Sequence, residues 1–514
     1  MNKINRLILA AAALFAGLPQ FARAFGPLAN LVGEQAPFIM LVDDVPGLLE
    51  KTKDGPLAKT WNDPQVREFF APLHERLKAA GVDDSLKQEI GYDTKELLAF
   101  ATGGVLLAIP NLEGWQERGF GVPPVLLVVE LGKNAARLQA LLASKAYLEK
   151  TKLARATGQY AGATLHTDEF AVGKKTVAVS WLISGGNLYC GTSRELVTGA
   201  LDAARAGGAR DAFGKSERFL RMSERVGGGA QVLTAINSQA AYPVLDTFLK
   251  AQAANPGNRA GMMIDLANLG ATLGLDALGD LYFATTFDKD FAGIASGLTY
   301  SAERGLLKIM LSFGDGPLPK PAFLPADSIT TGVMKFKMDD CLAVLEEAVQ
   351  AAMPMIFGYY QNSRAALNQQ YGIDIKRDLI GSLGDDVHVI QRAPAGETPV
   401  PGQLDQAFVI SLKDERLFSA TVEKLVAGSG VGEAVLARRE YLGATIYSNA
   451  NSQQTGSTLG WAVANGHLIV GTGASVGAVE AVLQGMAGKV DSFWDKPQVV
   501  RALAETPADA IAFS

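Results

Sequence analysis

The chain alternates short apolar runs with amphipathic segments, and this pattern predicts strands and helices together. Apolar or alternating runs bounded by glycine and polar residues are typical of strands. They occur at residues 38–42, 105–109, 125–131, 164–166, 177–183 and 188–190. Apolar residues at helical spacing predict helices over residues 64–80, 135–147 and 194–205.

Short turns between the apolar runs indicate antiparallel pairing. Gly185-Gly186 and Asn465-Gly466 each separate two apolar runs, which is typical of a β-hairpin. Residues 282–286, 292–300 and 306–313 are separated by polar turns and predict a three-stranded meander. The predicted fold class is therefore α+β, with helices packed on antiparallel sheets.

One order of segments occurs twice along the chain. Residues 160–165 read Tyr-Ala-Gly-Ala-Thr-Leu, and residues 441–446, which lie 281 positions later, read Tyr-Leu-Gly-Ala-Thr-Ile. Other segments keep an offset of 281 or 280: residues 93–98 with 374–379, 126–131 with 407–412, Trp181 with Trp461, Gly191-Thr192 with Gly471-Thr472, and 211–213 with 491–493. A register held over so many segments indicates an internal duplication.

The duplication predicts two homologous, pseudo-symmetric α+β modules, at residues 25–236 and 327–514. Residues 237–326 have no counterpart in the second copy, and we interpret them as the three-stranded meander followed by a connector. The prolines of residues 317–326 indicate that connector, because prolines at such spacing do not fit a central strand or a helix. Residues 510–512 correspond to a strand in the first copy, so the second copy is predicted to be incomplete: either the sequence is truncated there, which we favour, or the copy ends early and its last strand pairs at a sheet edge.

The first residues predict export. Residues 1–24 combine a basic start at Lys3 and Arg6, an apolar run over residues 7–18, and small residues at Ala22 and Ala24. These are the parts of a secretory signal peptide, with cleavage after Ala24. The apolar run is shorter than the roughly 20 residues that a membrane-spanning helix needs. We therefore predict a periplasmic or secreted protein.

Composition narrows the class of partner. Cleavage would remove three basic residues and no acidic ones, which leaves 44 basic and 53 acidic side chains and a net charge near −9. An acidic chain without a basic patch repels phosphate backbones, so nucleic acid is excluded as a partner. No apolar run after the signal peptide reaches membrane-spanning length, so the exported chain is expected to be soluble.

The repeated segments resemble an uncharacterised family of exported bacterial proteins, a domain of unknown function. The shared features are an opening strand followed by an Asp pair and a helix, a Gly-x-Asp segment before a second helix, the Tyr-x-Gly-Ala-Thr strands, and hairpins that end in Gly-Thr. In this chain they lie at Asp43-Asp44 and Asp339-Asp340, at residues 91–93 and 372–374, at Tyr160 and Tyr441, and at Gly191-Thr192 and Gly471-Thr472. The resemblance covers nearly all of residues 36–514. It implies the fold and export, and it carries no catalytic residues.

A glycine-rich segment at residues 471–477 offers two kinds of site. Its glycines could let a pyrophosphate approach a helix N-terminus, but the spacing is G-x-G-x-x-x-G and the preceding strand belongs to a hairpin. It also contains G-x-S-x-G around Ser475, the pattern of a hydrolase nucleophile, but no histidine follows it along the chain. Residues 213–216 end like a P-loop but lack its first glycine. We interpret all three as structural turns.

Acidic pairs are the next candidates. Asp43-Asp44, Asp339-Asp340 and Asp385-Asp386 could bind a hard cation or act in acid–base catalysis. In the first two pairs the second Asp precedes a helical pattern, which favours a capping role for Asp44 and Asp340. The third pair is interpreted as an exposed turn.

Histidine, cysteine and tryptophan are sparse. The spacing of the histidines and cysteines indicates no metal site. His166, His388 and His467 correspond to Tyr447, Leu107 and Asn187 in the other copy, and His74 lies on a charged helix. Cys190 and Cys341 correspond to Val470 and Val45, which favours a core role for both thiols. Trp181 and Trp461 are predicted to anchor their sheets. Trp61 and Trp494 begin a repeated helix start, and Trp115 is the aromatic residue considered for ligand contact.

We therefore assign no catalytic, cofactor-binding or metal-binding residue from the sequence, and the function is not determined by it. The leading hypothesis is a non-enzymatic binding or scaffold protein of the cell envelope, whose partner is an envelope protein or a small ligand. One alternative is an enzyme with a carboxylate site between the modules, at Asp43, Asp44, Asp339 and Asp340. Another is a carrier of an apolar ligand.

Overall fold

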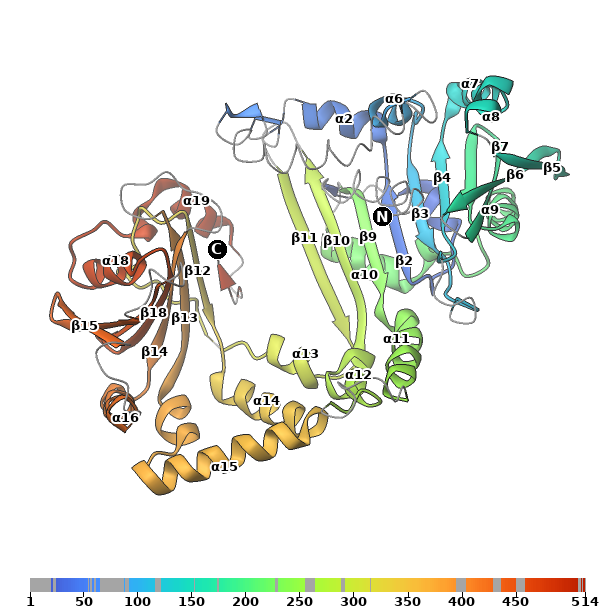
Figure 1. The fold of residues 1–514 in the computed structure, drawn as a ribbon. Helices are drawn as coiled ribbons and strands as arrows, with labels where there is room; N and C mark the ends of the chain where they lie inside the picture. Colours follow the sequence, from blue (N-terminus) through green and yellow to red (C-terminus); the bar gives the residue numbers. More distant parts are fainter. Residues whose placement is uncertain are drawn as a thin grey trace. The chain divides into compact units, whose positions relative to one another are not determined.

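The computed structural model (Figure 1) divides into two compact units, which we describe separately. Unit 1 contains residues 1–249 and 275–302, and unit 2 contains residues 250–274 and 303–514. The structure describes residues 20–21, 25–53, 55, 58–59, 62–64, 87, 92–115, 122–151, 153–172, 175–226, 230–254, 264–287, 292–314, 316–393, 404–428, 436–449, 458–506, 510 and 512–513.

Unit 1 is built on one antiparallel sheet whose strand order is β11-β10-β9-β2-β3-β4-β8-β7-β6-β5, with β1 also paired to β9. Its strands are β1 (Gln20–Phe21), β2 (Phe38–Val42), β3 (Val105–Ile109), β4 (Leu126–Glu130), β5 (Ala154–Tyr160), β6 (Ala163–Val172), β7 (Lys175–Ser184), β8 (Asn187–Gly191), β9 (Ala230–Asn237), β10 (Leu278–Phe287) and β11 (Ala292–Tyr300). The predicted hairpin strands on either side of Gly185-Gly186 are confirmed as β7 and β8.

Helices cover both faces of this sheet. They are η1 (Gly26–Asn30), α2 (Val45–Lys53), α6 (Thr94–Leu98), η2 (Gly132–Asn134), α7 (Ala135–Leu142), α8 (Lys145–Thr151), α9 (Arg194–Ala206), η3 (Phe213–Lys215), α10 (Glu217–Val226), α11 (Ser238–Ala253) and η5 (Leu275–Ala277). The helix predicted over residues 135–147 is in fact two helices. The chain breaks at Ser144, whose hydroxyl accepts a hydrogen bond from the Tyr147 amide at 3.1 Å and so favours a new helix start.

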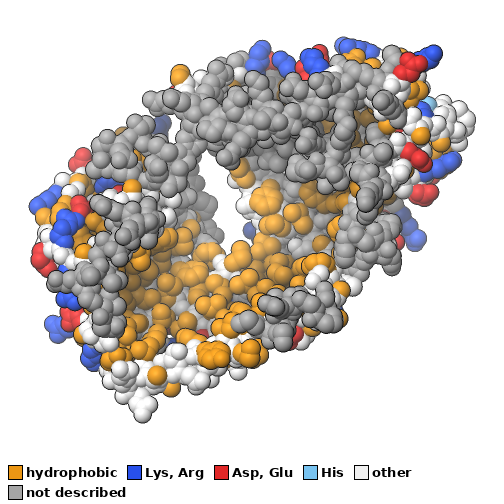
Figure 2. Space-filling view, in the orientation of Figure 1, with side chains coloured by type: hydrophobic (Ala, Val, Ile, Leu, Met, Phe, Trp, Pro, Cys, Tyr) orange, Lys and Arg blue, Asp and Glu red, His pale blue; other side chains and the backbone are white. Residues whose placement is uncertain are grey.

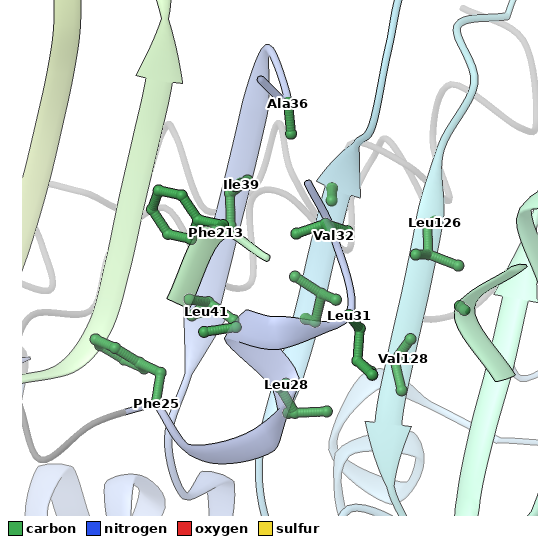
Figure 3. Close-up of a cluster of buried hydrophobic side chains, with 14 of the residues drawn as sticks. Phe25, Leu28, Leu31, Val32, Ala36, Ile39, Leu41, Leu126, Val128 and Phe213 are labelled. Atoms are coloured by element: carbon green, nitrogen blue, oxygen red, sulfur yellow. The ribbon is translucent and has the colours of Figure 1, made fainter. Parts of the chain in front are cut away.

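The main core of unit 1 lies on the face of the sheet that carries Ile39, Leu41 and Leu126. Figure 3 shows these side chains beside Val32 of the N-terminal segment and Phe213 of η3. Phe213 is completely buried, so the turn at residues 213–216 serves to insert an aromatic ring into the core.

Two strands of the predicted meander, β10 and β11, extend the sheet of unit 1. Arg218 of α10 holds them in place: its guanidinium donates to Asp280 of β10 and to the carbonyl of Glu34. The third predicted strand is wrong, because residues 305–310 form a helix. A short apolar run does not distinguish a strand from a helix, and here Gly305, at φ +57°, begins a helical turn.

Unit 2 contains an antiparallel sheet with the order β15-β16-β17-β18-β14-β13-β12-β19. Its strands are β12 (Thr330–Lys335), β13 (Leu383–Arg392), β14 (Asp405–Leu412), β15 (Leu436–Tyr441), β16 (Ala444–Asn449), β17 (Thr458–Ala464), β18 (His467–Gly473) and β19 (Ala512–Phe513). Its helices are α12 (Leu269–Thr272), α13 (Gly305–Met310), α14 (Met338–Ala352), α15 (Pro354–Tyr371), η6 (Ile375–Leu379), η7 (Ile380–Ser382), α16 (Glu415–Gly428), α18 (Gly477–Met486), η8 (Phe493–Asp495) and α19 (Pro497–Glu505). The predicted α+β class with antiparallel sheets is confirmed.

The two sheets share one strand order. Read from β19, the second sheet matches β9-β2-β3-β4-β8-β7-β6-β5 of the first, strand for strand. Trp181 pairs with Cys190 and with His166, and Trp461 pairs with Val470 and with Tyr447, as the sequence offsets predict. These registers are what two copies of one segment order would produce. The duplication itself stays a prediction.

The turns after Tyr160 and Tyr441 have the same backbone. Ala161 and Leu442 both have φ +51°, and the glycine that follows each also lies in the left-handed region. This conformation matches the twist of a two-residue hairpin. Both tyrosines also reach the helix that follows their hairpins: the Tyr160 hydroxyl donates to Asp202 of α9, and the Tyr441 hydroxyl accepts from Gln484 of α18.

The proline-rich segment at residues 317–326 belongs to the core of unit 2. It contains neither helix nor ladder strand, as its prolines predict, but Leu324 is completely buried in the core beside α18. The carbonyl of Leu324 accepts from the Phe493 amide at 2.8 Å, and in unit 1 the carbonyl of Val32 accepts from the Phe213 amide at 2.9 Å. The segment therefore has in unit 2 the place that residues 25–36 have in unit 1.

Several predictions concern residues that the structure does not describe. The signal peptide, the helix over residues 64–80, Trp61, Gly91 and His74 lie wholly or mostly outside the described residues. Within the described part of the chain, no helix has the combined length and apolar character needed to cross a lipid bilayer.

Candidate functional site

The glycine-rich segment after β18 is held by a buried carboxylate. Asp405, at the start of β14, is completely buried, and its carboxylate accepts from the Ser475 hydroxyl at 2.6 Å and from the Ser475 amide at 3.0 Å. A side chain at Gly473 would collide with Asp405. A carboxylate of the chain thus lies against this loop, where its negative charge opposes a phosphate, and the Ser475 hydroxyl donates its hydrogen bond to that carboxylate. The interpretation of Ser475 as part of a structural turn fits this geometry.

The three Asp pairs differ in their places in the secondary structure. Asp44 directly precedes α2, and its carboxylate lies against Gly47 in the first turn. The predicted cap at Asp340 is wrong, because α14 already begins at Met338 and places Asp340 inside its first turn. Asp385 and Asp386 were expected in a turn but lie in β13, where Lys413 and Lys335 each approach one of them at 3.9 Å.

His388 is the most buried histidine of the described chain, with 1% of its surface exposed. Its ring lies 5.7 Å from the Phe323 ring and 6.5 Å from the His467 ring, and its Nδ1 has no hydrogen-bond partner among the described residues. Burial, together with the His467 charge, lowers the pKa of His388 to about 4. At neutral pH the ring is therefore an uncharged core side chain.

This burial predicts acid sensitivity. Because the pKa of His388 is lower in the folded state than in the unfolded state, its contribution is constant above about pH 6.5 and is lost as the pH falls towards 4. The loss should reach about 2 kcal/mol of unfolding free energy by pH 5. Leucine stands at the corresponding positions of the first sheet, so His388→Leu should remove this loss in urea titrations at pH 7 and pH 5.

The matched control is His467→Asn, the residue type of its counterpart, which removes the smaller cause of the lowered His388 pKa and should keep most of the acid-dependent loss. An equal fall in stability for the wild type and His388→Leu would contradict the assignment to His388.

A buried ionic network in unit 1 was not identified from the sequence. Arg155 of β5 forms two hydrogen bonds with Asp168 of β6, at 2.5 and 2.7 Å, and donates to the Leu142 carbonyl at 2.6 Å. The Trp181 indole donates to the same carboxylate at 2.9 Å, and the His166 ring stacks on the indole at 4.2 Å. A hairpin turn at Ala161-Gly162 places residues 155 and 168 opposite one another, so the turn was the signal that could have found this pair.

The cysteines do not have the chemistry of nucleophiles. Burial and the nearby Asp168 carboxylate raise the pKa of the Cys190 thiol to about 12. Burial also raises the pKa of Cys341. Both thiols are free and protonated at neutral pH, which opposes attack on a substrate. Among the described residues, no three His, Cys, Asp or Glu side chains gather as a metal site requires.

Unit 2 contains a small polar pocket beside α15. It encloses about 270 Å³ and is lined by Gln361, Arg364, Ala365, Asn368, Asp374 and Ile375. Its charges are already paired, since Arg364 lies 3.2 Å from Glu346 and 3.5 Å from Asp374, while Lys376 lies 2.9 Å from Glu346. Asp374 also accepts from the Lys376 and Arg377 amides at the start of η6, as a helix cap does.

Among the described residues of unit 2, apolar side chains gather on the sheet face opposite α18. Residues that lie side by side on neighbouring strands form rows across this face, and these rows alternate with rows of buried residues. From β13 to β17 they carry no charged side chain. They contain Val387, Val389, Phe408, Ile410, Leu468, Val470, Trp461, Val463 and Leu459. We call these nine residues the open face. Phe408 is 38% exposed and Leu459 is 54% exposed. Figure 2 shows hydrophobic side chains gathered over β13 and β14.

The corresponding face of unit 1 is covered by the chain. Val45 and Leu48 of α2 and Leu98 of α6 pack on Met40 and Leu107 of the sheet. As a result, Met40 and Leu107 are at most 8% exposed. Trp181, the counterpart of Trp461, is 5% exposed and is covered by the stacked His166 ring and the Arg155 guanidinium. The open face of unit 2 is therefore a surface that this fold can cover with helices.

Comparisons of the chain with protein-family models, with curated proteins and with solved structures found no match.

Proposed function

We propose that the protein is an exported, non-enzymatic binding protein and that the open face of unit 2 is its binding surface. The observation that carries the proposal is a charge-free apolar sheet face with Phe408 and Leu459 exposed on it. Exposed apolar surface costs free energy in water, and contiguous patches of it are typical of binding sites. The N-terminal pattern of residues 1–24 supports export.

The candidate catalytic groups favour binding over catalysis. Ser475 donates to Asp405, Cys190 is held protonated, and Asp339 pairs with Lys413 at 3.0 Å. Each group has a structural partner or an environment that suppresses its reactivity. A catalytic site needs a free nucleophile or a base with a tuned pKa.

The proposal predicts that the open face binds an apolar fluorescent dye. The double variant Phe408→Ser, Leu459→Ser should weaken dye binding roughly tenfold, because the two lost side chains together remove apolar contact worth about 1.4 kcal/mol. The measurement is a fluorescence titration of the full-length chain with an anilinonaphthalene sulfonate.

Val500→Ser is the matched control. Val500 is 54% exposed on α19, outside the open face, so its loss removes a similar apolar side chain elsewhere. Equal dye affinity for the wild type and the double variant, with melting temperatures unchanged, would refute the open face as the binding surface.

A further inference from the structure

We infer that the open face binds one amphipathic helix of a partner protein; this inference rests on the proposed function and names its partner class. The first support is the covering of the matching face in unit 1. There Val45 and Leu48 of α2 and Leu98 of α6 belong to one hydrophobic cluster with side chains of the sheet. The same sheet geometry in unit 2 is suited to the same kind of occupant.

The second support is the course of α14. This helix follows β12 as α2 follows β2, but it packs mainly on the helices α12, α13, α15 and η7. Its principal contact with the sheet is with β13. Val344 and Ala348 of α14 are buried, and the main neighbours of this helix are α13 and α15. The helix that would cover the face in a unit 1 arrangement is thus engaged elsewhere in unit 2.

The third support is the size and shape of the open face. It crosses β13, β14, β18 and β17, and neighbouring strands lie about 4.8 Å apart, so it is roughly 15–20 Å wide. A helix of about 10–13 residues has that length, at about 1.5 Å per residue. The face is a sheet surface, whereas ligands of the size of a fatty acid are usually enclosed in concave pockets. The pocket of unit 2 described above is lined by other residues.

The fourth support is the border of the face. The row at this border ends at Leu459 of the open face and otherwise contains Gln391, Gln406 and Thr472, which are half-buried polar side chains in register with one another. An amphipathic helix has an apolar stripe bordered by polar side chains. Its stripe would meet the open face, and its border would meet the side-chain amides of Gln391 and Gln406.

The test uses the full-length chain and two 18-residue peptides made of leucine, lysine and glutamate. One peptide places its leucines at positions i, i+3, i+4 and i+7 on one helix face, and its isomer has the same composition with leucines spread around the helix. Binding is measured by fluorescence anisotropy and helix formation by circular dichroism. Palmitate is tested in parallel by its displacement of the dye.

The expected result is that the amphipathic peptide binds and gains helix, and that its isomer binds at least tenfold more weakly. Phe408→Ser with Leu459→Ser should weaken peptide binding roughly tenfold, and Val500→Ser should leave it unchanged. Equal binding of both peptides, or displacement of the dye by palmitate but by neither peptide, would overturn the helix inference and leave the proposed function standing. Dye, palmitate and peptide binding that are all insensitive to the double variant would overturn both.

Discussion

Asp168→Ala is expected to lower the free energy of unfolding by about 3–5 kcal/mol, the typical cost of leaving one member of a buried ion pair without its partner. Arg155 and Asp168 have 8% and 5% of their side chains exposed, so water cannot replace the lost carboxylate. The Trp181 indole would also lose its acceptor. Urea unfolding monitored by circular dichroism measures the change.

The chain provides a matched control for this prediction. At the corresponding hairpin of unit 2, Leu436 pairs with Asn449 in place of Arg155 and Asp168. The double variant Arg155→Leu, Asp168→Asn should therefore recover most of the lost stability, because it removes the unpaired guanidinium and keeps an acceptor for Trp181. A double variant as unstable as Asp168→Ala would show that the ion pair is not the source of the loss.

Asp405→Ala should destabilise unit 2 by about 3 kcal/mol, because two donors of Ser475 lose a charged, completely buried acceptor. Differential scanning calorimetry of the full-length chain should show a lower transition temperature. The same variant should raise proteolytic cleavage near residues 473–477, because the carboxylate orders that loop.

Ser475→Ala is the comparison for Asp405→Ala. It removes one hydroxyl donor and keeps the Ser475 amide bond to the carboxylate, so its cost should be smaller, about 1 kcal/mol. If Ser475→Ala abolished a hydrolytic activity of the purified protein without changing its stability, the structural interpretation of this loop would be wrong.

Local sequence patterns predicted the hairpins well, for a physical reason that the turns make clear. Asn465-Gly466 adopts left-handed φ values of 50° and 74°, which Asn and Gly tolerate better than other residues. Such a turn fixes which residues of the two strands lie opposite each other. The predicted equivalence of Trp181 and Trp461 in their hairpins follows from the same local rule.

Local patterns failed where two conformations satisfy the same pattern. Residues 305–310 are a short apolar segment that could form either a strand or a helix, and they form a helix that packs against α14. The Asp pair at 385–386 has a turn-like composition, but pairing with β12 keeps Asp386 in a strand. Contacts with distant segments decided both cases.

The sequence alone determined the α+β class, the hairpins and the repeated order of segments, because strand period and turn chemistry act over a few neighbouring residues. The tertiary structure decided which buried charges find partners. Asp405 and Ser475 are 70 positions apart, and nothing in either neighbourhood predicts their contact. It also decided that α2 covers its sheet while α14 packs on other helices, because the position of a helix depends on the sum of its packing contacts over the whole unit.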